Sequence, residues 1–357
     1  MVNKKKPVLF LLIILITLFT GTLMAEDRVI VFEELLDLVL EKNIELELAK
    51  LNLEDARIDY KKAELNNLLS KSRLLELQNE LQMVYAEQGF NDTRDGIIID
   101  IISKYLELIC INHQIHTAEK EVFLEEKRVE EVKAQVEVGY KSSLELFEQE
   151  TTYLSAVNSL ERLRGDLEQK TRELKQKAVL DNEYEIKLIE LEKPEIWRVS
   201  EESVLEEAVN TAVLGIRKKQ VEVAESDFIK ADISGIAELD LKKKELGQKK
   251  AELELERERQ NIENNARNTY FQYEEIVKNM NMTEKSLFQA EEHYRIIKEQ
   301  NSAGLVSNND LLSSELSLYK AQDYFLESIV NYYRVKLQLQ KIMGLDLEVG
   351  INNASSK

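Results

Sequence analysis

The residues whose types and spacing come closest to a metal site are Cys110, His113 and His116. Thiolate and imidazole side chains are common ligands of zinc. On a helix that turns by about 100° per residue, however, Cys110 and His116 point about 120° apart, so the three cannot converge on one ion without help from another chain. We therefore expect them to pack in or beside a helical seam, and the sequence predicts neither a metal site nor a cofactor.

Catalytic motifs are missing from the sequence as well. The chain has no phosphate-binding glycine loop, no nucleophile elbow, and no histidine near a paired serine or cysteine nucleophile. Its formal net charge of −19 gives a nucleic-acid partner no electrostatic support, and its single cysteine excludes an intrachain disulfide. These features argue against both an enzyme and a nucleic-acid-binding protein.

A Gly-x-x-Ser-x-x-acid-Leu motif occurs twice, 165 positions apart. Glycine readily takes the left-handed conformation that ends a helix, and serine followed three residues later by a carboxylate is the capping box that starts the next one. Each copy is therefore predicted to be a tight turn between two helices. The copies are Gly139, Ser142, Glu145 and Leu146 in the middle of the chain, and Gly304, Ser307, Asp310 and Leu311 near its end.

Long helical patterns precede both turns, beginning near Ser72 and near Ala237. Each covers about 67 residues, which corresponds to a rod of about 100 Å. An apolar stripe with a seven-residue period, as in both patterns, is typical of the seam of a left-handed supercoil. The stripe consists of Ile101, Leu108, Ile115, Val122, Val129 and Val136 in the first pattern, and of Ala266, Tyr273, Met280, Leu287 and Tyr294 in the second. We expect the first long helix to be weakened around Gly89 to Gly96.

Shorter helices are expected on either side of each long one, at about residues 33–67, 143–180 and 201–231 and after the Gly304 turn. The segment Asp181 to Ser200 is predicted to be a linker with one short strand, at mid-height beside Arg28 to Phe32 and Asp346 to Ile351. The sequence thus divides into a leader at 1–25, a first helical repeat with its linker at 26–200, a second repeat at 201–345 and a tail at 346–357.

The N-terminus has the three parts of a secretory signal peptide. Lys4, Lys5 and Lys6 precede an apolar run from Val8 to about Phe19, and Ala25 stands before the acidic pair Glu26 and Asp27. Cleavage after Ala25 is the preferred interpretation, and an uncleaved membrane anchor is the alternative. Either way, the chain is expected to be exported to the cell envelope, in the periplasm or at the outer membrane.

Three segments resemble the TolC-like outer-membrane efflux proteins. FEELLDLVLEKNIELELAKLNLEDARIDYKKAE (Phe32 to Glu64) looks like the first helix of that family, ESVLEEAVNTAV (Glu202 to Val213) like its counterpart in the second half, and AGLVSNNDLLSSELSLYKAQ (Ala303 to Gln322) like its second-half turn. The resemblance implies an all-α fold of two tandem short-long-short repeats, three copies of which form a hollow helical barrel in the periplasm.

The resemblance also implies partners at one end of that barrel. The two glycine turns would lie at its periplasmic tip and dock a membrane-fusion adaptor protein, through which an inner-membrane pump delivers substrate for efflux or secretion. The acidic excess is expected mainly on a solvated outer face, with a cation-attracting lumen as the alternative. The candidate docking residues are Gly139, Tyr140, Ser142, Ser143, Glu145, Gly304, Leu305, Val306, Ser307 and Asp310.

One feature departs from the family pattern. The family inserts a pair of membrane-spanning β-strands before the long helix of each half, but Ala63 to Arg73 and Ile229 to Glu238 are too short to hold them. We therefore expect a relative without these strands. A non-conducting coiled-coil structural or adaptor protein of the cell envelope is the alternative function.

Overall fold

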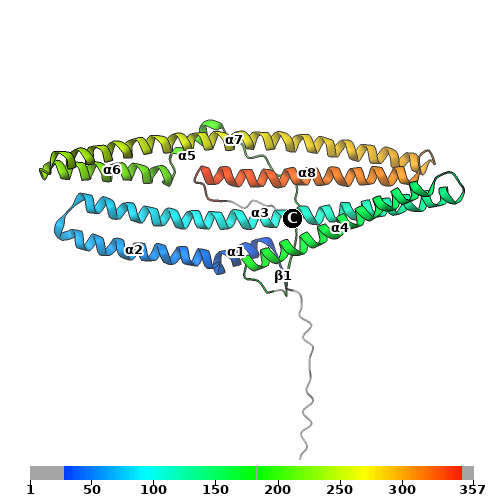
Figure 1. The fold of residues 1–357 in the computed structure, drawn as a ribbon, viewed down its shortest axis with the longest axis horizontal. Helices are drawn as coiled ribbons and strands as arrows, with labels where there is room; N and C mark the ends of the chain where they lie inside the picture. The colour runs from blue at the N-terminus through cyan, green and yellow to red at the C-terminus, as the bar shows by residue number, and fades with distance from the viewer. Residues whose placement is uncertain (1–27, 182, 348–357) are drawn as a thin grey trace, which may run out of the picture.

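The structure is a computed structural model that describes residues 28–181 and 183–347. It consists almost entirely of long antiparallel helices (Figure 1). In chain order the described elements are β1 (Arg28–Ile30), α1 (Phe32–Lys42), α2 (Ile44–Ser70), α3 (Arg73–Glu137), α4 (Ser143–Lys177), β2 (Tyr184–Ile186), α5 (Glu201–Val209), α6 (Ala212–Ile233), α7 (Glu238–Ser302) and α8 (Asn308–Ile342).

The helices repeat the same short-long-short plan in the two halves of the chain. The long helices α3 and α7 have 65 residues each, and the helices that follow their glycine turns, α4 and α8, have 35 each. In each half, the two shorter helices lie along opposite ends of the long one, α2 and α4 on α3, and α6 and α8 on α7 (Figure 1). The predicted all-α fold of two tandem repeats is therefore confirmed.

The two halves join through α3, which packs against both α6 and α8. At one end of the molecule the helices lie in the order α7, α6, α3, α2, and at the other end in the order α7, α8, α3, α4 (Figure 1). Consequently α7 forms one long edge of the molecule, and α2 with α4 forms the other.

Two of the shorter predicted helices are interrupted. The first breaks at Asn43, whose extended backbone ends α1, while its side chain caps α2 by accepting hydrogen bonds from the backbone N–H groups of Glu45 and Leu46 at 2.9 and 3.1 Å. The helix predicted at 201–231 breaks at Asn210 and Thr211, between α5 and α6. The Asn43 cap satisfies free N–H groups at the start of α2, whereas the Thr211 side chain does not cap α6 and donates instead to the last turn of α5.

The expected weakness around Gly89 to Gly96 is wrong, because α3 is helical through this segment. Two interior glycines disfavour a helix by about 1 kcal/mol each. Ile97 and Ile98, directly after them, are buried in the main hydrophobic core, together with Ile101 and Ile102. Packing of this apolar face therefore overrides the local propensity.

The connections between the short and long helices at the other ends are tight turns. Lys71 and Ser72 join α2 to α3, and residues 234–237 join α6 to α7. The expectation that no strand pair is inserted at these two positions is confirmed. The two strands within the described residues are β1 and β2, which pair in parallel with Arg28 beside Tyr184 and Ile30 beside Ile186.

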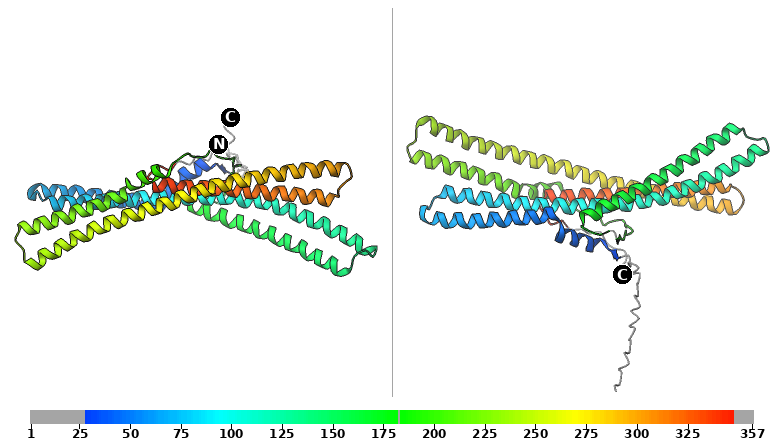
Figure 2. Two further views of the ribbon diagram at one scale, coloured as in Figure 1. Left: turned by 90° about the horizontal axis from the view of Figure 1, so that it is seen from above. Right: turned by 60° about the horizontal axis from the view of Figure 1, so that its bottom comes forward.

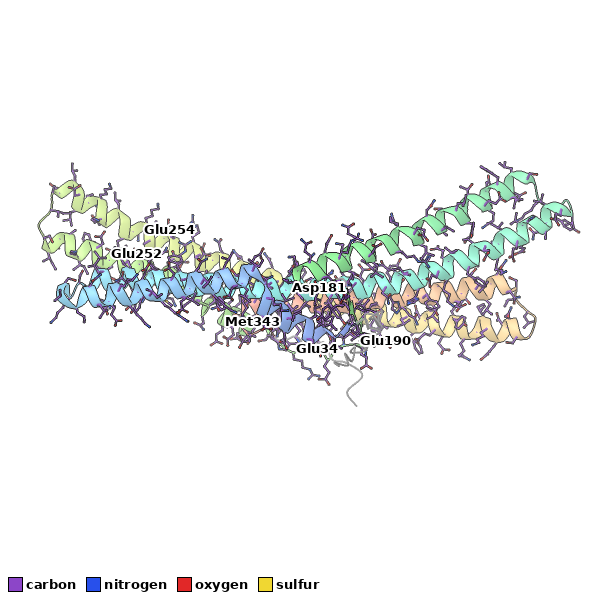
Figure 3. The ribbon with its side chains drawn as sticks, turned by 90° about the horizontal axis from the view of Figure 1, so that it is seen from below. Glu34, Asp181, Glu190, Glu252, Glu254 and Met343 are labelled. Atoms are coloured by element: carbon purple, nitrogen blue, oxygen red, sulfur yellow. The ribbon has the colours of Figure 1, made fainter. Side chains whose placement is uncertain are left out.

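Residues 183–200, which follow α4 in the described chain, lie against the middle of the long helices α3 and α7. The Tyr105 hydroxyl of α3 donates to the Lys187 carbonyl at 2.8 Å and accepts from the Ile189 N–H at 3.2 Å. On α7, Tyr273 donates to the Trp197 carbonyl at 2.6 Å. Glu34 of α1, Asp181 and Glu190 of the linker and Met343 after α8 mark this mid-height region in Figure 3. Residues 348–357 of the predicted tail lie outside the described part of the chain.

Burial of the two heptad seams decreases from mid-height toward the glycine turns. In α3, Ile101, Leu108 and Ile115 are buried, whereas the later seam residues Val122, Val129 and Val136 are half-buried. In α7, Ala266, Tyr273 and Met280 are buried, and Leu287 and Tyr294 are half-buried. The core thus lies at mid-height, and the hairpin arms are held by thinner contacts.

Among the described residues, no helix combines the length and apolarity needed to cross a bilayer. The predicted leader, residues 1–25, lies outside the described part of the chain.

Candidate functional site

The first candidate docking turn joins α3 to α4. Gly139 has φ of +81°, in the left-handed region that favours glycine, and its N–H donates to the Val136 carbonyl at 3.0 Å. Ser142 then starts α4 with a complete capping box. Its hydroxyl accepts from the Glu145 N–H at 3.3 Å, and the Ser142 N–H donates to the Glu145 carboxylate at 2.9 Å. Both predicted features of the motif, the left-handed glycine and the capping box, are present.

The second turn joins α7 to α8 and has the same construction. Gly304 has φ of +72° and donates to the Asn301 carbonyl at 2.9 Å. The Ser307 N–H donates to Asp310 at 2.9 Å, and the Asp310 N–H donates to the Ser307 hydroxyl at 3.1 Å. In addition, the Asn301 side-chain amide donates to the Val306 carbonyl at 3.1 Å, and this hydrogen bond across the turn stabilises it.

The capping hydrogen bonds change the acidity of the two carboxyl groups. The backbone N–H and the hydroxyl of Ser142 donate to Glu145 and lower the pKa of its carboxyl group. Ser307 lowers the pKa of Asp310 in the same way, through its hydroxyl and its backbone N–H. Hydrogen bonds to a carboxylate stabilise its charged form. Both carboxylates therefore stay ionised to lower pH than free side chains would.

The two turns lie at the same end of the molecule, but on separate hairpin arms that splay apart (Figure 2). The side chains of Tyr140 and Leu305 are 86% and 74% exposed. All ten candidate docking residues are exposed except Val306, which is half-buried. The structure thus presents the predicted residues to solvent as two separate surfaces within one chain.

Polar contacts tie the two arms together just behind the turns. Arg128 of α3 donates to the Ser313 hydroxyl of α8 at 3.0 Å, and Asn309 of α8 donates to Glu131 of α3. Farther from the turns, Lys120 pairs with Glu315 at 2.8 Å, and Lys320 pairs with Glu121 at 2.9 Å. These contacts could not be predicted from the sequence, because no short-range spacing signals a contact between residues almost 200 positions apart.

A buried carboxylate connects these contacts between α3 and α8 to α4. Glu125 of α3 is 6% exposed. It accepts hydrogen bonds from Arg128 at 2.6 Å and from the Gln149 amide at 2.6 Å. Since a buried charge is tolerated when it is paired and hydrogen-bonded, Glu125 fixes the relative position of α3 and α4 near the first turn.

The three residues considered as metal ligands do not converge. His113 Nδ1 lies 3.0 Å from the Asp323 carboxylate, whereas His116 faces Glu119 on its own helix at 3.6 Å. Cys110 is half-buried, and burial raises the pKa of its thiol to about 11. Within the described residues no group of histidine, cysteine and acidic side chains is arranged to hold a metal ion.

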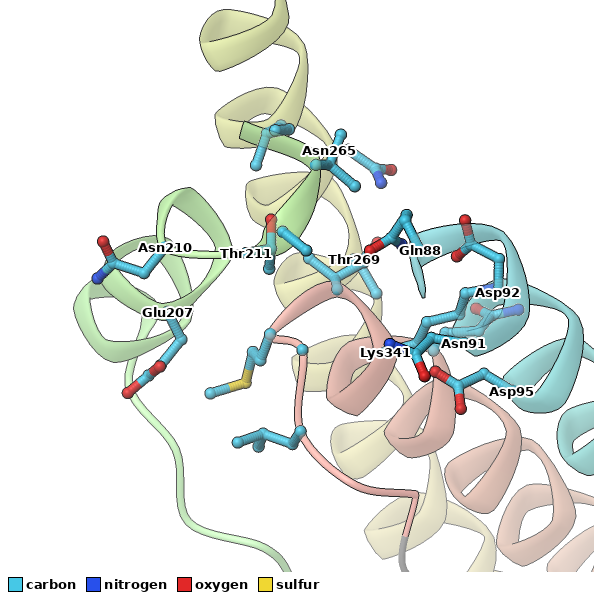
Figure 4. A pocket seen from close by; sticks show the side chains of 18 of the residues that line it. Gln88, Asn91, Asp92, Asp95, Glu207, Asn210, Thr211, Asn265, Thr269 and Lys341 are labelled. Carbon is cyan, nitrogen blue, oxygen red and sulfur yellow. The ribbon is translucent and has the colours of Figure 1, made fainter. Parts of the chain in front are cut away.

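A polar groove of about 1020 Å³ lies at mid-height between α3, the α5–α6 junction, α7 and the end of α8 (Figure 4). It is rich in side-chain amides, which come from Gln88, Asn91, Asn210, Asn265, Asn268, Gln272 and Gln338. Arg94 at its edge pairs with Asp346, in the segment after α8, at 3.4 Å. The groove joins segments that are distant in the sequence, and its one local signal is the density of asparagine and glutamine at 260–272.

Comparisons with known proteins identify the fold. No family model and no curated protein matches the chain by sequence. Among solved structures, the chain is similar to the outer membrane protein VceC of Vibrio cholerae, with a TM-score of 0.63 and 14% identity over 89% of this chain and 97% of that chain. It is also similar to the MtrE outer membrane channel of Neisseria gonorrhoeae, solved in its open state, with a TM-score of 0.62 and 15% identity over 89% of each chain.

The outer membrane channel CmeC of Campylobacter jejuni gives a TM-score of 0.65 and 12% identity over 92% of this chain and 87% of that chain. The likeness thus extends over nearly the whole length of these structures. At sequence identities this low, the similarity shows a shared fold. The chain has the fold of the subunits of TolC-like outer-membrane efflux channels.

Proposed function

We propose that this chain is the subunit of a trimeric conduit for efflux or secretion, whose two glycine turns dock a membrane-fusion adaptor. The observation that carries the proposal is the pair of unpartnered apolar stripes on the two long edges of the subunit. The shared fold supports it, because the similar solved structures are described as outer-membrane channels.

The first stripe runs along α7. If each residue of a helix turns by about 100°, its five members lie within about 40° of one line, opposite the buried residues Ala266, Tyr273 and Met280. Their side chains are between 44% and 66% exposed. These exposed apolar side chains share one line of a solvated helix, with polar residues such as Asn264 and Glu275 between them, and they offer separate apolar contact points to another chain. The stripe consists of Leu246, Leu253, Phe271, Met282 and Ile296.

The second stripe lies on the opposite edge. On α2, Ile44, Leu48, Leu51 and Ile58 are between 45% and 71% exposed and lie on the side of the helix away from the buried Leu46 and Leu53. On α4, Phe147 and Leu154 continue this edge toward the first glycine turn, at 66% and 58% exposure.

The α7 edge and the α2/α4 edge both expose apolar residues but are different surfaces. Contact between them therefore favours a head-to-tail assembly. The α7 edge of one subunit would cover the α2/α4 edge of the next, and repetition of such a contact closes into a ring when its rotation permits. A closed ring of long rods encloses a channel along their axis. Three subunits is the number that the resemblance implies.

The docking role rests on the exposure and shape of the two turns. Tyr140 and Leu305 offer large apolar surface at the end of each arm, and the capping boxes hold the backbone that carries them. Opening of the proposed channel at the end with the glycine turns would be passive. The arms would separate by breaking the contacts between α3 and α8, such as Arg128 with Ser313, while the pump supplies the energy.

Photo-crosslinking in the intact cell tests both parts of the proposal. A photoreactive phenylalanine at Tyr140 or Leu305 is expected to capture an envelope protein with a coiled-coil hairpin, and one at Phe271 is expected to capture a second copy of this chain. Self-capture at Phe271 without adaptor capture at the turns would contradict docking and support a non-conducting structural protein. Failure of self-capture would contradict the ring.

A further inference from the structure

The polar groove at mid-height has no role in the proposed conduit. We call it the amide groove, after the seven asparagine and glutamine side chains that line it (Figure 4). It lies where α8 ends at Ile342 and α6 begins at Ala212, between the long helices α3 and α7. Its volume of about 1020 Å³ is at the upper end of the range of ligand pockets, about 300–1,000 Å³. The groove is therefore large enough for an organic ligand with several polar groups.

The walls of the amide groove are held in place by the protein itself. Gly344, with φ of +66°, passes so close to the α5–α6 junction that a Cβ atom there would lie 3.2 Å from the Thr211 side chain. The Thr211 hydroxyl donates to the Ala208 carbonyl at 2.9 Å, and Asp346 pairs with Arg94 of α3 at 3.4 Å. The groove is thus formed without a ligand, which lowers the cost of binding one.

Most hydrogen-bonding groups of the amide groove have no protein partner. Six of its seven side-chain amides make no hydrogen bond with another described residue. The seventh, Asn210, uses only its N–H group, which donates to the Glu206 carbonyl at 3.0 Å. In solution water satisfies these groups, so a ligand binds well only if it replaces those hydrogen bonds.

A buried hydroxyl in the same groove also lacks a partner. Thr269 of α7 lines the groove and is 7% exposed. Its hydroxyl makes no hydrogen bond within the part of the chain that the structure describes, although a helical threonine can donate to the carbonyl one turn back. The fully enclosed side-chain atom without a partner among the described residues is Gln340 Oε1, so the Thr269 oxygen is still open to the groove. A buried polar group without a partner is costly, and a ligand that bonds to it removes that cost.

The charged side chains of the groove limit the charge of a ligand. Four carboxylates and two cationic groups line it, which gives a formal charge of −2. Arg94 pairs with Asp95 at 3.2 Å and with Asp346 at 3.4 Å. Asp92 and Lys341 make no ion pair with any described residue. An anionic ligand is therefore disfavoured, whereas an uncharged or cationic one is accepted.

The lining also selects the functional groups of a ligand. No aromatic ring of the described chain lines the groove, so the face of a sugar ring would find no ring to stack on. Each side-chain amide offers a carbonyl acceptor and N–H donors in one plane, and a secondary amide offers one of each. A ligand with several secondary amides can therefore replace the water on several lining groups at once.

We propose that the amide groove binds a hydrophilic, uncharged or cationic solute that carries secondary amide groups, as short peptides and N-acetylated sugar oligomers do. The Thr269 hydroxyl and side-chain amides such as that of Gln272 bond to the amide groups of the solute. The inference goes beyond the proposed conduit and does not depend on it, because one chain supplies every residue of the groove.

Isothermal titration calorimetry of the purified protein tests the proposal with three uncharged probes. N-acetyl-trialanine amide carries the amides of a peptide, tri-N-acetylchitotriose carries those of a sugar, and maltotriose carries hydroxyl groups alone. At least one amide probe is expected to bind at least tenfold more tightly than maltotriose. The tighter of the two amide probes identifies the source of the amide.

Two pairs of variants test the residues. Gln272→Leu should weaken binding of the amide probe about fivefold to tenfold, the effect of one or two hydrogen bonds. Gln289→Leu is the matched control, because Gln289 is an exposed glutamine of α7 outside the groove. Thr269→Val should weaken binding about fivefold, whereas Thr269→Ser keeps the hydroxyl and should bind like the wild type. A helical circular dichroism spectrum that matches the wild type shows that each variant is folded.

Three results would overturn the proposal. They are the absence of wild-type binding to both amide probes, equal affinity for maltotriose, and equal affinity of Gln272→Leu and the wild type for the amide probe.

Hydrogen exchange locates the bound probe. The amide probe should slow exchange at the α5–α6 junction and at residues 343–347, and leave the Gly304 turn unchanged. Slowing at the Gly304 turn alone would also contradict the proposal. Because none of these measurements involves an adaptor or a ring, failure here is distinguishable from failure of the conduit.

Discussion

The hydroxyl of Tyr332 accepts a hydrogen bond from the backbone N–H of Trp197 at 2.9 Å, and it donates to the carbonyl of Glu195 at 3.2 Å. Tyr105 makes the same bridge to the carbonyl of Lys187 and the N–H of Ile189. Two buried tyrosines, one on α8 and one on α3, thus fasten the linker at two successive places. This relationship explains how an extended segment stays ordered against helices.

Removal of either hydroxyl is expected to weaken the mid-height core. Tyr332→Phe leaves the Trp197 N–H and the Glu195 carbonyl without that partner, which should cost about 1–3 kcal/mol of unfolding free energy. Chemical denaturation followed by circular dichroism measures this cost. Tyr324→Phe is the control, because the Tyr324 side chain is 64% exposed, and its stability should equal that of the wild type. Equal stability of Tyr332→Phe and the wild type would show that the bridge does not hold the linker.

The glycine turns should not tolerate β-branched residues. At φ of +81° and +72°, valine in place of Gly139 or Gly304 is strained, by roughly 1–2 kcal/mol at each site. The strain should deform the turn, and under the proposed function it should reduce adaptor capture and export. Gly165→Val is the control, since Gly165 lies within α4 with open space around it. Full export by the double variant Gly139→Val/Gly304→Val would remove the docking role from these turns.

The capping boxes should make both turns sensitive to acid. The folded-state pKa of Glu145 lies below its ordinary value of 4.5, and that of Asp310 lies below 3.8. A depressed carboxyl pKa contributes stability above the unfolded-state value, and this contribution is lost as the pH falls through the folded-state pKa. The protection of the amides at the first residues of α4 and α8 against hydrogen exchange, relative to the intrinsic exchange rate at each pH, should therefore fall below about pH 4.

Amide variants provide the control for this acid response. Glu145→Gln and Asp310→Asn cannot titrate, so exchange at the same amides should follow only the intrinsic pH dependence of exchange. If the wild type and these variants responded identically to acid, the carboxylates would not be the cause.

The apolar stripe on α7 should control assembly. Phe271→Asp places a charge on the stripe, whereas Phe288→Asp places one on another side of the same helix, and the two phenylalanines are 59% and 62% exposed. We expect Phe271→Asp to dissociate the oligomer and Phe288→Asp to leave it intact, as measured by sedimentation equilibrium. Equal effects of the two variants would show that the α7 edge is not the interface.

Most of the helical plan could be predicted from the sequence, because its signals are local. The heptad stripe through Ile101 and Leu108 gives the long helix its length and its buried face. The spacing of Gly139 and Ser142, repeated at Gly304 and Ser307, gives the turns. The wrong expectation concerned Gly89 to Gly96, where the weak propensity of two glycines gave way to tertiary packing of the isoleucines that follow.

The features that could not be predicted arise from contacts between distant residues. The contact of Arg128 with Ser313 joins two helices whose register depends on the whole core. The bridge from Tyr332 to the linker depends on where an irregular backbone passes a helix. The exposed apolar stripes differ from these long-range contacts, because the apolar periodicity of α2 and α7 is visible in the sequence. Only the structure shows that these faces remain uncovered within one chain.

In the proposed conduit the subunits close side by side into a hollow ring, which electron microscopy of the purified oligomer would make visible. End-on class averages are expected to show three-fold symmetry around an empty centre, with side views as long as the helical rods. Averages of a filled bundle, a two-fold pair or a single subunit would contradict the conduit.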